Sequence, residues 1–241
     1  MGAALGWGAL ATSSLVVGVL LAFARPWRSA LIGLILAFGA GALISAVSFE
    51  LAAEGSRVGS TAAVAIGLAL GALTYYLADG LIARRTQTGP GKRGRKSGEN
   101  AGNSLALGAF LDGIPEQLVL GVGLAGGEPI KAALLVAIFV SNLPEGMGST
   151  ADMSAAGTSR SQILRLFLAV GLICTAATGV GYAIADSISG ELQAAVHGFA
   201  AGALLVMLID SMIPDAQDKA GRPAGLAAVL GFGVAAALSS I

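Results

Sequence analysis

The stretch Ser141–Gly146 reads Ser-Asn-Leu-Pro-Glu-Gly, and it lies inside an apolar segment of membrane length, at about residues 129–153. A second stretch, Asp112–Gln117, reads Asp-Gly-Ile-Pro-Glu-Gln inside the preceding apolar segment, at about residues 103–125. Charged groups in hydrocarbon are costly, so they are rare unless they face a partner, a water-filled cavity or an ion. The proline in each stretch also frees one backbone carbonyl from the helix. We therefore expect the function of this chain to reside in these two stretches.

The composition predicts a membrane protein. The chain has 241 residues, of which 55% are hydrophobic and 12% are charged, unlike a soluble domain. A helix that crosses a membrane needs about 20 mostly apolar residues. Stretches of this kind lie at about 4–24, 29–53, 60–84, 103–125, 129–153, 161–186, 191–214 and 222–241. The sequence thus predicts an all-α membrane protein with eight transmembrane helices in a single domain, residues 1–241.

The distribution of charge predicts the topology. Basic residues gather in the loops after the first, third, fifth and seventh stretches, and by the positive-inside rule these loops are cytoplasmic. Both termini then face outward, in a multi-pass protein of a cell or inner membrane. The third loop, residues 85–102, is rich in Gly, Lys and Arg, and we expect it to be disordered. We interpret it as a topology determinant and solvated linker, and expect no nucleic-acid partner.

A short internal repeat links the second and seventh stretches. Phe38–Leu43 reads Phe-Gly-Ala-Gly-Ala-Leu, and Phe199–Leu204 reads Phe-Ala-Ala-Gly-Ala-Leu. A match without gaps also places Glu54 on Asp215. Because five spans separate the copies, they cross the membrane in opposite directions, which is typical of secondary transporters. The pattern predicts an inverted repeat of spans 1–3 and 6–8 around a central pair, spans 4 and 5.

The polar residues of the central pair have helical spacing. Asp112 and Glu116 are four residues apart, and Ser141 and Asn142 precede Glu145 by four and three residues, so each set shares one helix face. If the two helices are antiparallel neighbours, they form a cage of three carboxylates, a hydroxyl and an amide. Adjacent carboxylates at low dielectric must bind a cation, hold protons, or do both in turn. This predicts a metal site that is coupled to protonation.

Glu50 and Asp210 are further carboxylates at membrane depth, one in each copy of the repeat. They could supply additional ligands or relay protons, and a structural hydrogen bond is an equally good interpretation. His197 is the single histidine, near the start of the seventh stretch. We interpret it as an interfacial residue rather than a ligand.

The two proline–glutamate stretches resemble motifs of the ZIP (Zrt-, Irt-like) family of divalent-metal transporters. That family has eight spans, both termini outside, a long third loop, and a His-Asn-x-Pro-Glu-Gly motif in the fourth span. The resemblance implies metal binding by Asp112, Glu116 and Glu145. It also implies ligand positions at Ser141 and Asn142, and one at Asp210. Asp112 stands where the family has histidine, Gly113 stands where it has asparagine, and the third loop lacks a histidine cluster. We expect one main metal.

The resemblance implies uptake of a divalent metal, as substrate rather than cofactor, toward the cytoplasm by alternating access, and a homodimer is plausible. Family membership favours zinc, whereas an almost all-oxygen ligand set shifts weight toward Mn²⁺ or Fe²⁺. One alternative is a carrier of protons or an organic solute that uses the carboxylates as a relay. Another is an intramembrane metal-dependent enzyme, but the sequence has no histidine-pair zinc motif, so we expect no enzyme. A third is an adaptor that works through the basic loop.

Overall fold

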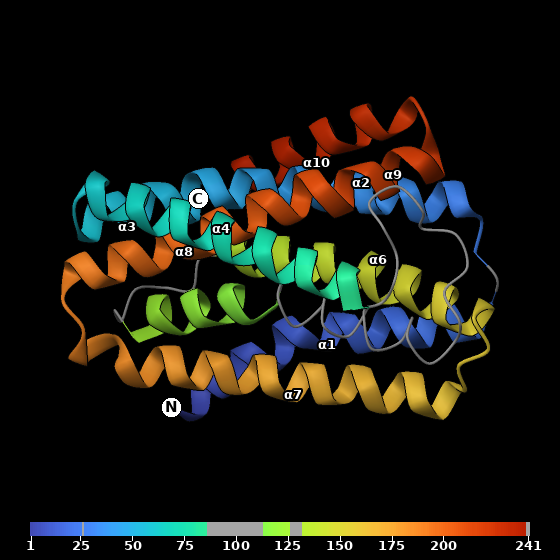
Figure 1. The fold of residues 1–241 in the computed structure, drawn as a ribbon, viewed down its shortest axis with the longest axis horizontal. Coiled ribbons are helices and arrows are strands. Elements are labelled where there is room, and N and C mark those ends of the chain that lie inside the picture. The colour runs from blue at the N-terminus through green and yellow to red at the C-terminus, as the bar shows by residue number, and fades with distance from the viewer. Residues whose placement is uncertain (26, 86–112, 126–131, 240–241) are drawn as a thin grey trace.

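The computed structural model describes residues 1–25, 27–85, 113–125 and 132–239, which form a bundle of helices lying side by side (Figure 1). The described part of the chain contains no strand, and it includes five helices that are long and apolar enough to cross a membrane. These findings confirm the prediction of an all-α, multi-pass membrane protein. Eight crossings remain a prediction. Asp112 and the basic loop after Arg85 lie outside the described residues.

The helix bounds follow the predicted apolar stretches to within a few residues at most ends. The chain forms α1 (Gly2–Ala24), α2 (Ser29–Ala46), η1 (Val47–Ala52), α3 (Ala53–Val58) and α4 (Thr61–Arg85). The next described helix is Gly113–Ala125. It is followed by α6 (Ala132–Ala155), α7 (Arg160–Ile184), η2 (Ala185–Ser187), α8 (Gly190–Met207), η3 (Leu208–Met212), α9 (Ile213–Ala220) and α10 (Pro223–Ser239).

Two of the helical segments are longer than the apolar stretches that predict them. The second runs from Ser29 to Val58 and the seventh from Gly190 to Ala220, as 30 and 31 residues. Their polar ends, α3 and α9, remain helical and pair their own charges. Arg57 Nη1 lies 3.1 Å from Glu54 Oε2, and Lys219 Nζ lies 2.7 Å from Asp215 Oδ2. Such pairs three or four residues apart extend a helix past its apolar part.

Both long segments contain a π-helical turn at matching positions. The π-helical turn η1 begins at Val47 and η3 begins at Leu208, and the offset of 161 residues is the one that relates Phe38 to Phe199. The two segments run side by side in opposite directions, so that α3 and α9 lie at opposite ends of the bundle (Figure 1). π-Turns are rare and occur frequently at functional sites. Their shared position is the main structural support for the proposed inverted repeat.

Glycines let the helices pack closely, in place of bulky side chains. Helix α4 packs on α8 and α10 packs on α2. A Cβ at Gly71 would collide with the carbonyl of Phe199, and a Cβ at Gly231 would collide with the carbonyl of Phe38. The two phenylalanines are the first residues of the matched stretches Phe38–Leu43 and Phe199–Leu204. Each matched stretch thus packs against a glycine of a helix next to the other stretch, Phe38 against α10 and Phe199 against α4.

A second group of helices carries the proline–glutamate stretches. Helix α1 packs on α6 and α7, with Gly18 against the carbonyl of Leu143. The helix Gly113–Ala125 packs on α7, where Gly181 faces the carbonyl of Leu118. The helices α2, α4, α8 and α10 form the first group, and α6 also packs on two of them, α2 and α10. The bundle therefore consists of two groups that meet along α6.

Candidate metal site

The helix Gly113–Ala125 holds Glu116 in the interior and is fixed in place by α7. Thr178 Oγ1 donates a 2.6 Å hydrogen bond to Gln117 Oε1, and both side chains are fully buried. A Cβ at Gly113 would lie 2.6 Å from Cys174 Sγ, so a larger residue would not fit there without a shift. The glycine at this position of the motif thus has a packing reason. These contacts set the position of Glu116 relative to α7.

Glu116 and Glu145 come together in the bundle. The side chain of Glu116 is 3% exposed, and its Oε1 has no hydrogen-bond partner among the described residues. The carboxylate of Glu145, on α6, is close enough to interact with it electrostatically. Glu145 is half-buried, and two carboxylates this close at the edge of the interior repel unless a cation or a proton lies between them. The pair can therefore bind a divalent cation through oxygen ligands.

Helix α6 brings further oxygen atoms next to Glu145. Ser141 and Asn142 are both buried, at 2% and 6% exposure. Ser141 Oγ donates to the carbonyl of Ile138 at 3.0 Å, which leaves its oxygen lone pairs as acceptors. Pro144 lies inside α6, and the carbonyl of Val140 that it frees lies against Gly39 of α2. Hydroxyl, amide and carbonyl oxygens are ligands that hard divalent cations accept.

The other predicted ligands do not join Glu116 and Glu145 in the described part of the structure. Asp112 falls outside the described residues. Glu50 is buried at 5% exposure on η1, whereas Asp210 is exposed on η3. Within the described ranges, no three His, Cys, Asp or Glu side chains form a group that could hold a metal. The structure thus brings Glu116 and Glu145 together, and neither Glu50 nor Asp210 completes a cluster with them.

Sequence reasoning missed three polar residues in the interior. His197 is 3% exposed, with Nδ1 2.9 Å from the carbonyl oxygen of Gln193, so it packs inside the bundle rather than on its surface. It is buried because Gly55 of α3, opposite it, has no side chain; a Cβ there would lie 3.0 Å from His197 Cβ. Gln117 and Thr178 form the contact described above. The available signal was the polarity of these residues inside apolar segments.

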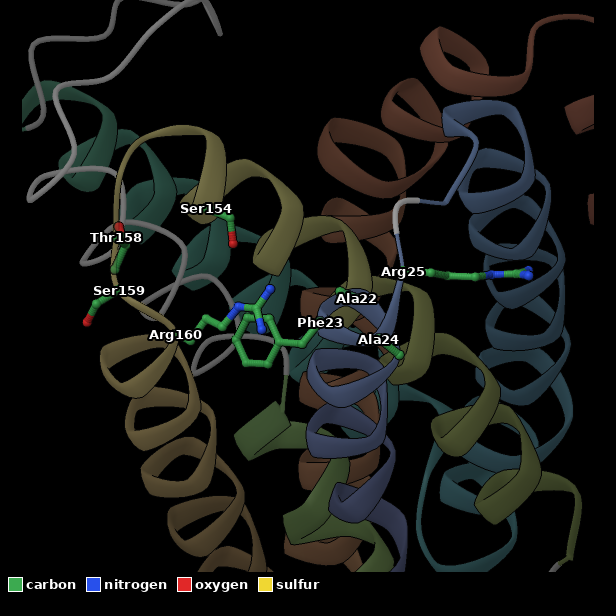
Figure 2. A pocket seen from close by; sticks show the side chains of 8 residues that line it. All are labelled: Ala22, Phe23, Ala24, Arg25, Ser154, Thr158, Ser159 and Arg160. Atoms are coloured by element: carbon green, nitrogen blue, oxygen red, sulfur yellow. The ribbon is translucent and has the colours of Figure 1, made fainter.

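A separate pocket lies at one end of the bundle. It is lined by the end of α1, the end of α6 and the start of α7, and Figure 2 shows the Arg160 guanidinium over the ring of Phe23, at 5.3 Å. Arg25 points away from the pocket and stacks on Trp27 at 3.9 Å. Ser154, which lines the pocket, follows Glu145 by nine residues, or about 13 Å along a helix. This pocket is therefore not the carboxylate site.

Comparison with known proteins gives one relative that supports a metal-related function. No family model matches the chain. A protein of Arabidopsis thaliana named "putative zinc transporter" is 28% identical over 207 residues, which are 84% of this chain and 33% of the relative. The chain therefore spans about a third of the length of the curated relative that it matches.

Proposed function

We propose that this chain is a multi-pass carrier of a divalent metal cation, with zinc as the first candidate substrate. The observation that carries the proposal is the meeting of Glu116 and Glu145, which come from two separate proline-containing helices. Glu116 is buried and Glu145 is half-buried, so water only partly screens the repulsion between the two carboxylates, and a divalent cation between them would offset it. The similarity to a plant protein named as a zinc transporter, and the resemblance of both motifs to the ZIP family, support the same substrate class.

In this proposal, Asp112, Ser141 and Asn142 complete the oxygen ligands, and Glu50 and Asp210 supply ligands or relay protons along the route. Both glutamates of the site belong to the helix group formed by α1, α6, α7 and Gly113–Ala125. Motion of this group against α2, α4, α8 and α10 would expose the site to alternate sides of the membrane. The two matching π-turns and the antiparallel course of their segments support the inverted repeat that such motion needs. Eight spans, outward termini and transport toward the cytoplasm belong to this proposal.

The test is metal uptake into proteoliposomes that contain the purified chain, with Zn²⁺, Mn²⁺, Fe²⁺ and Cd²⁺ compared across an imposed pH gradient. We expect saturable uptake of at least one ion, lost in Glu116→Ala and in Glu145→Ala. Glu191→Ala is the matched control, because this carboxylate is exposed at the start of α8 and accepts hydrogen bonds from Ser60. Normal uptake in both interior variants would refute the site. A proton or organic-solute flux without metal dependence would favour the alternative carrier.

A further inference from the structure

A lysine–aspartate pair of α9 lies against α6, one helical turn from Glu145. Lys219 Nζ is 2.7 Å from Asp215 Oδ2, and the two side chains are 18% and 36% exposed. The sequence suggests a loop lysine here, but α9 stays helical to Ala220 and carries Lys219 into the bundle. A Cβ on Gly33 of α2 would lie 2.7 Å from Lys219 Cβ, and a Cβ on Gly148 of α6 would lie 3.4 Å from Lys219 Nζ. The ammonium group therefore rests on α6.

The point of contact on α6 belongs to the face that carries the site. Gly148 follows Glu145 by three residues and Asn142 by six, so the three residues lie on one side of the helix. One helical turn separates Gly148 from Glu145, about 4.5 Å along the axis. A glycine at this position leaves space for the ammonium group. A cation bound at Glu145 would lie about one helical turn from the point where the pair contacts α6, and the partly buried pair would be only partly screened from it.

We propose that the Asp215–Lys219 pair is a charge-balanced gate next to the metal site, which sets the apparent affinity for the transported cation. This inference rests on the proposed function. The Lys219 ammonium neutralises Asp215, so a cation that moves along this face of α6 meets little net charge. Without the ammonium, the free carboxylate would attract and retain the cation. Without the carboxylate, the unpaired ammonium would repel it.

The repeat provides a matched pair at the other end of the bundle. Glu54 is the counterpart of Asp215 in the gap-free match, and it binds Arg57 at 3.1 Å. This pair differs in its surroundings, because its cation, Arg57, is 67% exposed where Lys219 is 18% exposed, although Glu54 itself is 19% exposed. Water and salt screen an exposed pair strongly. We therefore expect the Glu54–Arg57 pair to have little effect on the cation, which makes it the control for the Asp215–Lys219 pair.

The experiment measures initial rates of Zn²⁺ uptake into proteoliposomes against Zn²⁺ concentration. It compares the full chain with Lys219→Gln, Asp215→Asn and the double variant. We expect Lys219→Gln to lower KM by about fivefold and Asp215→Asn to raise it by about fivefold, the scale of one partly screened charge. The double variant should return to within about twofold of the unchanged chain, because it restores zero net charge. Glu54→Gln and Arg57→Gln should each stay within about twofold.

Opposite shifts of KM in the two single variants distinguish a gate from a merely structural ion pair. Equal KM values, or shifts in the same direction, would overturn the gate, and the proposed function would stand if uptake still required Glu145. No uptake of any tested metal by the unchanged chain would overturn both. Asp215→Asn keeps the shape of its side chain and leaves Lys219 in place. It therefore tests the repulsion by the ammonium even if Lys219→Gln fails to fold.

Discussion

The hydrogen bond between Thr178 and Gln117 should fix the helix that carries Glu116, and Thr178→Val tests this. Valine has nearly the shape of threonine but has no hydroxyl group. Both side chains are 0% exposed, so no water can replace the 2.6 Å bond from Thr178 Oγ1 to Gln117 Oε1. Gln117 Nε2 already has no partner among the described residues. The substitution would therefore leave the whole amide of Gln117 without a hydrogen bond inside the described part of the chain.

The expected cost follows from the burial of this amide. Leaving one buried polar group unsatisfied costs about 1–3 kcal/mol. Hydrogen bonds between membrane helices measure lower, at about 0.6 kcal/mol on average and up to about 1.7. We expect a loss of about 1–2 kcal/mol, which is a fall of roughly 2–8 °C in melting temperature for a chain of this size. Because Gln117 adjoins Glu116, we also expect zinc affinity to fall about tenfold, as for other residues that orient a ligand.

The assay is thermal unfolding in detergent, with zinc binding measured on the same samples. Thr175→Val is the matched control on α7. Thr175 Oγ1 lies 3.1 Å from Thr12 Oγ1, which also lies 3.0 Å from the carbonyl oxygen of Gly8, so no buried acceptor loses its only donor. If Thr178→Val were as stable as Thr175→Val and bound zinc equally well, the bond would have no role in placing Glu116.

Two further predictions test the packing and the ends of the helices. Gly202→Ala should destabilise the chain by about 1–3 kcal/mol in thermal unfolding, because its Cβ would collide with the Leu68 carbonyl of α4. The control Gly225→Ala has open space around it and should be neutral or stabilising. Equal melting temperatures of the two variants would contradict the close packing of α4 and α8. Ser159→Ala removes the side chain that caps α7 together with Gln162, and it should cost about 1 kcal/mol in the same assay; no loss would show that the cap is unimportant there.

The sequence predicted the helical membrane class and most helix ends because a lipid environment leaves few choices. Backbone groups in hydrocarbon must bond within their own segment, so long apolar stretches become helices. The exceptions are the ends of the second and seventh segments. Glu54 and Asp215 directly follow the predicted stretches 29–53 and 191–214, yet they lie within helices that continue to Val58 and Ala220. Their charges pair locally, a possibility that hydropathy alone does not reveal.

The site was predictable in part. Helical spacing placed Ser141 and Asn142 on the face of Glu145, and the structure buries both. Spacing along one helix cannot show which other helix lies opposite. The proximity of Glu116 to Glu145, the burial of His197 behind Gly55 and the position of Lys219 over Gly148 all depend on packing between distant segments. The roles of Asp112, Glu50 and Asp210 stay predictions.

The sequence by itself determined that this chain forms apolar helices with carboxylates at membrane depth, because hydropathy and proline act on each segment separately. The tertiary structure alone decided which helices meet. Glycines at positions such as Gly71, Gly181 and Gly231 allow close contact only with one partner backbone, and these contacts arrange the two helix groups. That arrangement places Glu116 close enough to Glu145 to interact with it, and it places Lys219 against α6 at Gly148. The physical reason is that close packing requires two helices with complementary surfaces. The sequence of one helix does not show which other helix has the surface that complements it.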